Sequence, residues 1–304
     1  MSKTVLVTGA NTGIGYALCK LLATEHGCSV LLGSRTKSKG EKAVADIKKL
    51  APNASVELVE IDVSSDESVA AAAAAVKAKG VTLYGLVNNA GVGLNTNGDI
   101  IETNFKGPIR VSEAFLELIE DKGRIVNVSS GGASSWVRQQ DEATKKFYSD
   151  PDISLEALEA DVAKQAAGAE GGWPGVYGLS KAGLTAYTLY QARAYPHLTC
   201  VSRPASVGCR RVDGVSVPSK PLTRAQVALT WLYSNKHDEG LRRQAHSGAG
   251  MRVVVACTLR RRDIGLVLRL GREAVAADVL PRSRHAGIRG RGEPGPDAIQ
   301  QLVQ

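Results

Sequence analysis

The sequence has no uninterrupted apolar run of about 18 residues, the length that a membrane-spanning helix requires. Its first eight residues pass directly into a strand-like run and lack the architecture of a signal peptide. No Cys-x-x-Cys spacing typical of zinc or redox sites occurs among its five cysteines, which are Cys19, Cys28, Cys200, Cys209 and Cys257. We therefore expect a cytoplasmic protein with reduced thiols, no metal site and no membrane partner.

Acidic and aromatic residues are scarce in the last third of the chain. Residues 1–202 carry 20 basic and 22 acidic side chains, whereas residues 203–304 carry 18 and 8. No aromatic residue follows Tyr233. The net charge of +8 therefore comes from the tail. Nucleic-acid binding through this tail is only a remote alternative, because the tail lacks interleaved aromatics and any recognisable module.

From residue 4 to about residue 200, strand-like and helix-like segments alternate regularly. The expected strands are Thr4–Val7, Ser29–Gly33, Val56–Val63, Leu83–Val87, Ile125–Val128 and Leu198–Val201. The expected helices are Ile14–Glu25, Lys37–Leu50, Asp66–Lys79, Asp99–Ile119 and Tyr177–Ala194. Short apolar strands separated by amphipathic helices predict an α/β fold with a parallel sheet covered on both faces.

A glycine-rich loop follows the first expected strand and opens the first expected helix. It reads Thr8-Gly9-Ala10-Asn11-Thr12-Gly13-Ile14-Gly15. At such a turn the free N–H groups and the dipole of the helix favour phosphate groups. The loop therefore predicts a doubly wound dinucleotide-binding fold, with the ligand along the carboxyl ends of the strands.

Tyr177 and Lys181 are four residues apart at the start of the last expected helix. Residues at this spacing lie on one face of a helix, so the ammonium can reach toward the phenol or toward a ligand beside it. A cation there stabilises a phenolate and makes the phenol a stronger acid. Such a pair alone is common on amphipathic helices. Together with the glycine loop, it predicts hydride chemistry on a carbonyl group.

A long insertion, residues 131–176, separates the fifth expected strand from the helix of Tyr177. Short helices are expected in it, because apolar residues at helical spacing follow Pro151 and Ser154, namely Leu155, Leu158 and Val162. At the carboxyl edge of the sheet, the insertion can wall a substrate cleft or serve only as packing. The sequence leaves these two roles open.

Five motifs resemble, in order and spacing, those of the short-chain dehydrogenase/reductase family. They are Thr8-Gly-x-x-x-Gly13-x-Gly15, Asn88-Asn89-Ala90-Gly91, Asn104, Asn127-Val128-Ser129-Ser130 and Tyr177-x-x-x-Lys181. The resemblance covers residues 3 to about 204 and implies a Rossmann fold over residues 1–202. The long insertion and Gly172-Trp173-Pro174 are similar to the carbonyl reductase branch. In that branch the insertion covers the helices that other members use to assemble, which implies a monomer.

The resemblance implies a catalytic set of Asn104, Ser130, Tyr177 and Lys181. Tyr177 would donate a proton to the carbonyl oxygen. Ser130 would hydrogen-bond that oxygen, which can lower the activation barrier by ~3 kcal/mol. Lys181 would hold the nicotinamide ribose hydroxyls, and Asn104 would keep a water that links Lys181 to solvent. Ser129 is expected to point the other way, because side chains alternate along a strand.

The expected cofactor is NADP(H). The second expected strand ends Leu32-Gly33-Ser34-Arg35, where an arginine suits a 2′-phosphate and no acid is present to bind a 2′-hydroxyl. By resemblance, Asp62 would contact the adenine amino group. Asn88 and Ala90 would line the adenosine ribose side, although Asn88 can equally brace the sheet. The full set of implied cofactor-binding residues is Gly9, Asn11, Thr12, Gly13, Ile14, Gly15, Arg35, Asp62, Val63, Asn88, Ala90, Tyr177, Lys181 and Pro204.

The resemblance ends in the Arg-rich region of residues 203–304. Pro204 stands where the family has a proline followed by glycine, but Ala205 replaces the glycine. We interpret this region as atypical, and as partly disordered or translated out of frame. The reason is that codons can be chosen for residues 263–290 such that a one-base shift reads as a family-like, tyrosine-rich segment. Leu222–Ser234 is still expected to form a helix, because Ala225, Leu229 and Leu232 have helical spacing.

Loss of the usual last strand would leave a sheet edge and a helix face uncovered. We therefore expect lower stability or activity than in a relative with an ordinary C-terminus. The predicted function is NADPH-dependent reduction of a small-molecule aldehyde, ketone or quinone. The alternative is a relative that binds NADP(H) without turnover, which the altered tail favours and the intact Ser130, Tyr177 and Lys181 disfavour.

Overall fold

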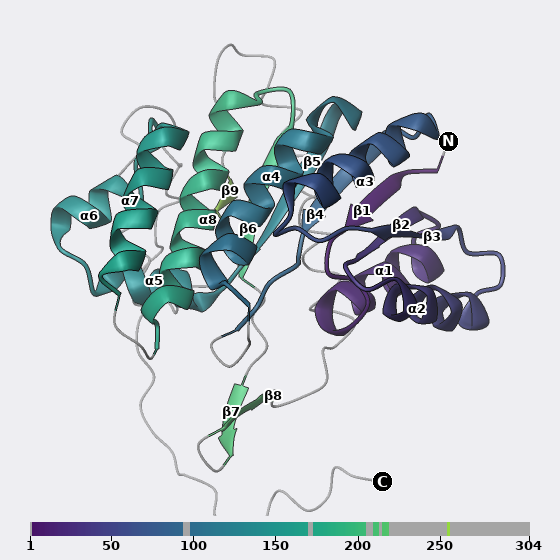
Figure 1. Cartoon of the computed structure of the whole chain (residues 1–304), viewed down its shortest axis with the longest axis horizontal. Helices are drawn as coiled ribbons and strands as arrows, with labels where there is room; N and C mark the ends of the chain where they lie inside the picture. The colour runs from purple at the N-terminus through teal and green to yellow at the C-terminus, as the bar shows by residue number, and fades with distance from the viewer. Residues whose placement is uncertain are drawn as a thin grey trace, which may run out of the picture. The chain divides into compact units, whose positions relative to one another are not determined.

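The computed structural model describes residues 2–93, 98–169, 173–204, 209–212, 215–218 and 254–255. The chain divides into residues 1–258 and residues 259–304, and the second unit lies outside the described residues. The first unit contains a parallel sheet flanked by helices (Figure 1). The expected α/β, doubly wound architecture is therefore confirmed.

The main sheet has the strand order β3-β2-β1-β4-β5-β6-β9. Its strands are β1 Thr4–Val7, β2 Ser29–Ser34, β3 Val56–Glu60, β4 Leu83–Asn88, β5 Ile119–Ser129, β6 Thr199–Pro204 and β9 Val254–Val255. A separate antiparallel pair consists of β7 (Cys209–Val212) and β8 (Val215–Pro218). All pairings within the main sheet are parallel, as the alternating pattern predicts.

The helices agree closely with the segments expected from periodicity. They are α1 Gly13–Glu25, α2 Lys37–Leu50, α3 Asp66–Ala78, α4 Gly107–Phe115, α5 Gly131–Arg138, α6 Glu142–Phe147, α7 Leu155–Ala167 and α8 Gly175–Ala194. A π-helical turn, η1 (Glu102–Lys106), precedes α4, and a 3-10 turn, η2 (Leu116–Leu118), follows it. The prediction that helix continues to Ile119 is wrong, because Ile119 pairs with Leu83 at the start of β5.

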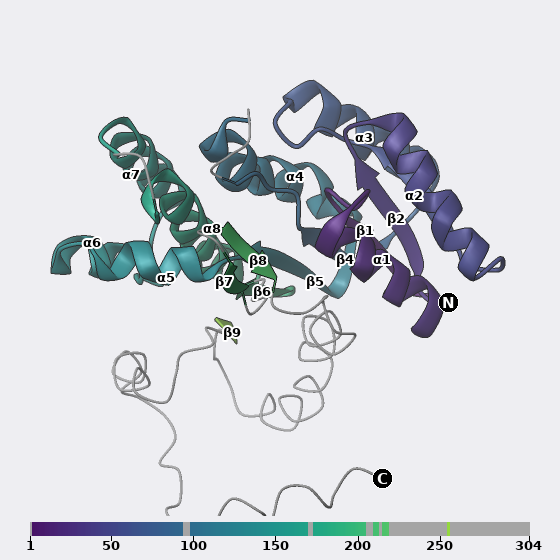
Figure 2. The same cartoon turned by 90° about the horizontal axis from the view of Figure 1, so that it is seen from below.

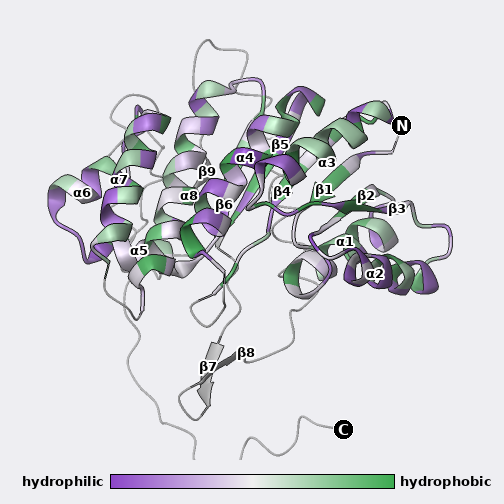
Figure 3. Ribbon diagram, in the orientation of Figure 1, coloured by the Kyte–Doolittle hydropathy of each residue, from purple (hydrophilic) through white to green (hydrophobic). Residues whose placement is uncertain are grey.

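Alternation along the strands divides the core between the two faces of the sheet. Val5 and Val7 of β1 pack with residues of α1 and α2, whereas Leu6 packs with residues of α3 and α4. Hydrophobic residues dominate the central strands, while α2 carries many hydrophilic residues (Figure 3). Burial on both faces explains why these strands are continuously apolar rather than alternating.

The insertion forms α5, α6 and α7, which lie together beside α8 (Figures 1 and 2). The hydroxyl of Ser154 caps α7 by accepting a hydrogen bond from the N–H of Ala157 at 3.2 Å. Leu158 and Val162 are buried in a third apolar cluster shared with α8. The expected short helices are thus confirmed. Of the two roles left open, α7 serves as packing.

Most predictions for the tail lie outside the described residues, including a helix over Leu222–Ser234 and the segment of residues 263–290. The expectation of an uncovered edge on β6 needs a correction. Val254 and Val255 of β9 pair with Val201 and Ser202, so two residues of this edge are covered. The helices of the described residues include none with the length and apolar composition of a membrane-spanning segment.

Candidate active site

The motif residues meet at one edge of the sheet because the strands are parallel. The strand register pairs Val7 with Val87, Asn88 with Asn127, and Ser129 with Pro204. The glycine loop after β1, the Asn-Asn-Ala-Gly segment that begins at the end of β4, and Ser130 after β5 therefore follow neighbouring strand ends. This is the edge at which doubly wound sheets bind ligands.

The glycines of the loop are required by the backbone and by close packing. Gly9 and Gly13 have φ angles of 61° and 60°, a region that disfavours side chains. A Cβ atom on Gly9 would lie 2.7 Å from the Cα of Ala90, and one on Gly15 would lie 2.8 Å from the carbonyl oxygen of Gly9. The loop therefore lies directly against Ala90 and against the start of α1.

Thr8 and Asn89 hold this loop in place. The hydroxyl of Thr8 accepts hydrogen bonds from the N–H groups of Asn89 and Ala90, each at 3.1 Å. The side-chain amide of Asn89 donates hydrogen bonds to the carbonyl oxygens of Thr8 at 2.8 Å and Gly9 at 3.2 Å. Both residues belong to the motifs, but sequence reasoning gave them no role. Their polar side chains beside the loop were the available signal.

The N-terminus of α1 is suited to an anion. Thr12 occupies the N-cap position in an extended conformation, and no side chain caps the helix. The first turn contains no acidic residue. Asn11 and Ile14 flank this cap and are half-buried. Uncapped N–H groups and the helix dipole stabilise negative charge at such a position, and the residues present therefore fit a dinucleotide.

Arg35 follows β2 directly and is exposed. The half-buried Asp62 lies within the electrostatic reach of this guanidinium. Burial alone would raise the pKa of the Asp62 carboxyl. Hydrogen bonds from the N–H and hydroxyl of Ser64, at 3.0 and 2.6 Å, and the positive charge of Arg35 outweigh burial and lower that pKa. Asp62, which lies in the loop after β3, is thus an ionised hydrogen-bond acceptor.

Val63, in contrast, belongs to the core on the α3–α4 face of the sheet. Its carbonyl oxygen accepts a hydrogen bond from Arg110 of α4 at 2.7 Å. A Cβ atom on Gly107 would lie 3.0 Å from the Val63 side chain. A contact between Val63 and a ligand would therefore be made by its backbone N–H and not by its side chain.

Lys181 and Asn104 converge on Gly91. A Cβ atom on Gly91 would lie 3.1 Å from Asn104 Oδ1 and 3.6 Å from Lys181 Nζ. Lys181 is only 5% exposed, and its Nζ donates a hydrogen bond to the carbonyl oxygen of Val128 at 2.9 Å. Burial lowers the pKa of Lys181 from 10.5 to about 8. The structure thus brings three of the sequence motifs to one point.

Asn104 lies within the π-helical turn η1, a distortion that is frequent at functional sites. Its amide donates to the carbonyl oxygen of Val92 at 2.9 Å and to the hydroxyl of Ser180 at 3.3 Å. Its Oδ1 accepts from the N–H of Val92 at 2.7 Å. Ser180 in turn donates to the carbonyl oxygen of Tyr177 at 2.7 Å. Sequence reasoning missed Ser180, although it lies between Tyr177 and Lys181.

Ser130 and Tyr177 meet at Gly132. The hydroxyl oxygen of Ser130 caps α5 by accepting a hydrogen bond from the N–H of Gly132 at 3.1 Å. A Cβ atom on Gly132 would lie 3.2 Å from the ring of Tyr177. Both side chains are half-buried. The structure therefore brings the proposed proton donor and the proposed oxygen-binding serine to the same end of α5.

Ser129 points away from this site, as the alternation of side chains predicts. Its hydroxyl donates to the carbonyl oxygen of Lys181 at 3.2 Å and lies 2.9 Å from the hydroxyl of Thr185. Ser129 is 4% exposed. Ser129 therefore ties the end of β5 to α8.

The side chain of Asn88 braces the interior. Its amide donates to Ser112 at 3.0 Å and to Asn127 at 2.8 Å. Asn127 then donates to Thr188 at 2.9 Å and to Gln191 at 2.7 Å. These buried bonds join β4, α4, β5 and α8. Of the two roles left open for Asn88, the structure favours the bracing role for its side chain.

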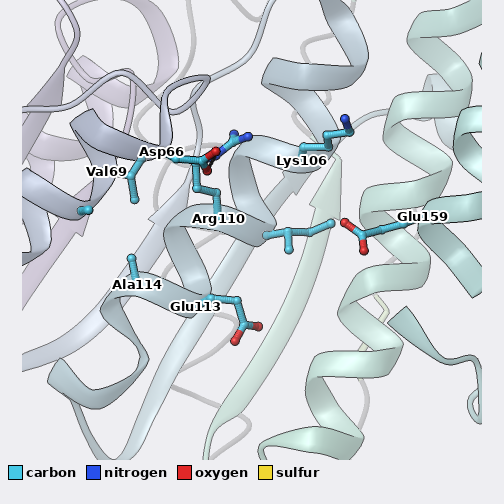
Figure 4. A pocket seen from close by; sticks show the side chains of 9 residues that line it. Asp66, Val69, Lys106, Arg110, Glu113, Ala114 and Glu159 are labelled. Atoms are coloured by element: carbon cyan, nitrogen blue, oxygen red, sulfur yellow. Dashed lines mark hydrogen bonds and ion pairs between the residues drawn. The ribbon is translucent and has the colours of Figure 1, made fainter. Parts of the chain in front are cut away.

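A depression of about 520 Å³ lies elsewhere, among α3, α4 and α7 (Figure 4). Its cations are paired: Arg110 contacts Asp66 and Glu102, and Lys106 lies 3.2 Å from Glu102. None of the candidate site residues lines it. The depression is therefore separate from the site around Gly91 and Gly132.

Comparison with known proteins identifies the family. The family model described as short chain dehydrogenase matches residues 3–144. The chain is 32% identical over 235 residues to short-chain dehydrogenase/reductase 1 of Saponaria officinalis, covering 64% of this chain and 77% of that protein. It is 32% identical over 205 residues to carbonyl reductase (NADPH) 1 of Mus musculus, covering 62% of this chain and 73% of that protein.

A solved structure supports the same assignment. Salutaridine reductase from Papaver somniferum superimposes with a TM-score of 0.58 at 25% sequence identity, covering 67% of this chain and 86% of that one. The residues that the family model matches include the glycine loop and strands β1 to β5. The chain belongs to the short-chain dehydrogenase/reductase family of oxidoreductases.

Proposed function

We propose that this oxidoreductase reduces the carbonyl group of a small molecule with NADPH. The observation that carries the proposal is that Lys181 and Asn104 converge on Gly91. Lys181 lies on α8, the helix that also carries Tyr177. The mouse relative is named as an NADPH-dependent carbonyl reductase, which agrees with this chemistry. The arrangement unites a buried cation, a phenol and an uncapped helix N-terminus at one edge of the sheet.

The residues present fit a nicotinamide dinucleotide. Gly9, Gly13 and the N-terminus of α1 would hold the pyrophosphate, because the space at the Cβ position of Gly13 is open and the helix N-terminus is uncapped. Arg35 would pair with the 2′-phosphate, since its guanidinium is exposed directly after β2. Lys181 would bind the ribose hydroxyls. When bound, the cofactor supplies the hydride.

Four further members of the implied cofactor set would contact the adenosine part of the cofactor or border the site. Asp62 would accept a hydrogen bond from the adenine amino group, and the N–H of Val63 would contact the same ring. Ala90 would line the ribose side, where it lies against Gly9. Pro204 would close the site from the end of β6, since the strand register places it beside Ser129.

Tyr177 and Ser130 would act on the carbonyl oxygen. The hydroxyl oxygen of Ser130 already accepts a hydrogen bond from Gly132, so its hydrogen is available to donate to the substrate. A fixed donor where negative charge develops is worth ~3 kcal/mol of barrier. Tyr177, whose ring also lies against Gly132, would then donate the proton that completes the alcohol.

Lys181 and Asn104 would support the proton transfer. With a pKa of about 8, the buried ammonium of Lys181 is mostly charged at neutral pH. A nearby cation favours loss of the phenolic proton. Asn104 is fixed by its bonds to Val92 and Ser180, and we propose that it keeps a water beside Lys181 through which the proton is replaced.

We also propose that the protein is a cytoplasmic monomer. The face of α8 that carries Gly183 packs against Val162 of α7, where a Cβ atom on the glycine would lie 3.0 Å from the valine. A helix face covered in this way is not free to pair with a second copy. Analytical ultracentrifugation of the full chain would test this, and a dimer would contradict it.

The test of the function separates turnover from binding. The full chain is incubated with NADPH and a panel of aldehydes, ketones and quinones, and consumption of NADPH is followed by absorbance. NADPH affinity is measured in parallel by titration calorimetry. Turnover of at least one carbonyl compound supports the proposal. Binding without turnover supports the non-catalytic alternative, and absence of both contradicts the two.

A further inference from the structure

Trp173 is one of two large apolar side chains of the described residues that are mostly exposed, with 61% of its surface open to solvent. It stands two residues before α8, and its ring centroid lies 5.7 Å from that of Tyr177, with 30° between the planes. A Cβ atom on Gly132 would lie 3.1 Å from the outer edge of the indole. The indole and the phenol therefore cover the same glycine, beside Ser130.

Core packing does not account for this indole. Trp136, in comparison, is 6% exposed, and its ring lies 5.0 Å from that of Tyr148 within the third apolar cluster. The other exposed large apolar residue, Leu50, is the last residue of α2, where none of the candidate site residues lies. Ligand sites are lined largely by apolar and aromatic side chains, and an exposed indole next to a reactive phenol provides such a surface.

The geometry points to Trp173 as a substrate-binding residue that selects carbonyl compounds with a planar aromatic group. The inference rests on the proposed carbonyl reduction. A substrate whose oxygen reaches Ser130 and Tyr177 has its substituents next to the indole, because both residues and the indole meet at Gly132. An aryl substituent can stack on the indole, whereas a short alkyl chain covers much less of it.

The expected difference follows from the size of an aromatic contact. An aromatic pair contributes binding free energy from its buried apolar area and a further amount from the contact between the rings. Loss of both contributions weakens binding of an aryl substrate roughly tenfold. The loss for an alkyl substrate is smaller, because only a part of the apolar contact is removed. The ratio of the two specificity constants therefore reports on Trp173, and effects common to both substrates cancel.

The experiment compares naphthaldehyde with hexanal, which share the reacting group and differ in the attached group. Steady-state kinetics with NADPH are measured for wild type, Trp173→Leu and Trp173→Phe, with Leu50→Ala as the matched control at the other exposed apolar side chain. In Trp173→Leu, kcat/KM for naphthaldehyde relative to hexanal falls roughly tenfold, mainly through KM. Trp173→Phe retains most of the ratio, and Leu50→Ala retains all of it.

An unchanged ratio of the two kcat/KM values in Trp173→Leu, including equal losses for both aldehydes, would overturn the inference. If wild type reduces neither aldehyde, the role of Trp173 is decided by binding alone. The proposed function itself fails only if no compound of the panel of aldehydes, ketones and quinones is reduced. Equilibrium dialysis with naphthylmethanol gives that answer. Weaker binding to Trp173→Leu than to wild type supports the indole as a ligand contact. Equal binding, or no binding to wild type, overturns it.

Discussion

The Nζ of Lys181 donates a hydrogen bond to the carbonyl oxygen of Val128 at 2.9 Å. Val128 lies on β5, two residues before Ser130, and Lys181 lies one helical turn after Tyr177. The bond therefore joins the strand that leads to the proposed oxygen-binding serine and the helix that carries the proposed proton donor. Because the ammonium is buried there, its charge is sensitive to pH near neutrality.

The specificity constant kcat/KM for NADPH should depend on the charge of Lys181. Burial lowers the pKa of Lys181 to about 8, and kcat/KM for NADPH reports ionisations of the free enzyme. We expect this constant to fall roughly tenfold per pH unit above about pH 8, as the ammonium loses its proton. Lys181→Met should give a low constant without this fall. A wild-type profile that stays flat to pH 10 would contradict a binding role for the ammonium.

The same shift predicts how stability changes with pH. The folded-state pKa of about 8 lies below the ordinary 10.5, so the unfolded chain binds more protons between these values. The free energy of unfolding therefore gains up to about 3 kcal/mol from this group as pH rises through that window. Cys19 and Cys200, whose pKa burial raises, act in the opposite direction. Urea unfolding of wild type and Lys181→Met isolates the lysine by difference, and parallel pH curves would exclude the shift.

Gly132 should be needed for activity more than for folding. A Cβ atom there would lie 3.1 Å from the indole of Trp173 and 3.2 Å from the ring of Tyr177, which is tighter than ordinary contact. Gly132→Ala should displace the phenol and lower kcat roughly tenfold or more, at a cost of about 1–3 kcal/mol in stability. Gly131→Ala is the matched control, because a Cβ atom there meets nothing within 4 Å. Similar kinetics for the two variants would count against the placement of Tyr177.

Arg35 should set the choice of cofactor. Replacing its charge with a carboxylate in Arg35→Glu should raise KM for NADPH roughly 10- to 100-fold, because a charge-assisted bond to the 2′-phosphate is replaced by repulsion. KM for NADH should fall or stay the same. Lys49→Glu, the same change of charge at an exposed position of α2, controls for long-range electrostatics. An unchanged NADPH to NADH preference in Arg35→Glu would remove Arg35 from the cofactor site.

The hydrogen bonds of Asn127 should contribute strongly to stability. Its side chain is fully buried and bonds to Asn88, Thr188 and Gln191. Asn127→Ala leaves these buried groups without their partner and should cost about 2–4 kcal/mol in the free energy of unfolding. Asn53→Ala, on an exposed turn, should change it by less than about 0.5 kcal/mol. Denaturant titration of both variants decides, and equal midpoints would contradict the bracing role.

Local patterns were sufficient to predict the layers of the fold. Continuous apolar strands and helical spacing place β1 and α2 at the bounds that the sequence predicts. The motifs likewise place Gly9, Lys181 and Tyr177 on the elements expected for them. These features depend on neighbours in the chain, since burial on both faces removes polar residues from a strand regardless of its distant partners.

Features that depend on distant contacts could not be predicted in this way. The bond from Asn127 to Gln191 spans 64 residues, and no local signal marks either side chain as its partner. The π-helical turn around Asn104 interrupts a segment whose periodicity indicates one regular helix. The early start of β5 at Ile119 follows from pairing with Leu83 and from a shift in register before Gly85.

Tyr177 is the proposed donor of the proton that reaches the carbonyl oxygen. Tyr177→Phe keeps the ring against Gly132 and removes only the hydroxyl, so it tests the proton transfer itself. With wild type and variant side by side, we predict that kcat for aldehyde reduction falls roughly 100- to 10,000-fold, while the Kd for NADPH from titration calorimetry changes by less than about threefold. A variant that retains wild-type kcat would show that Tyr177 is not the proton donor.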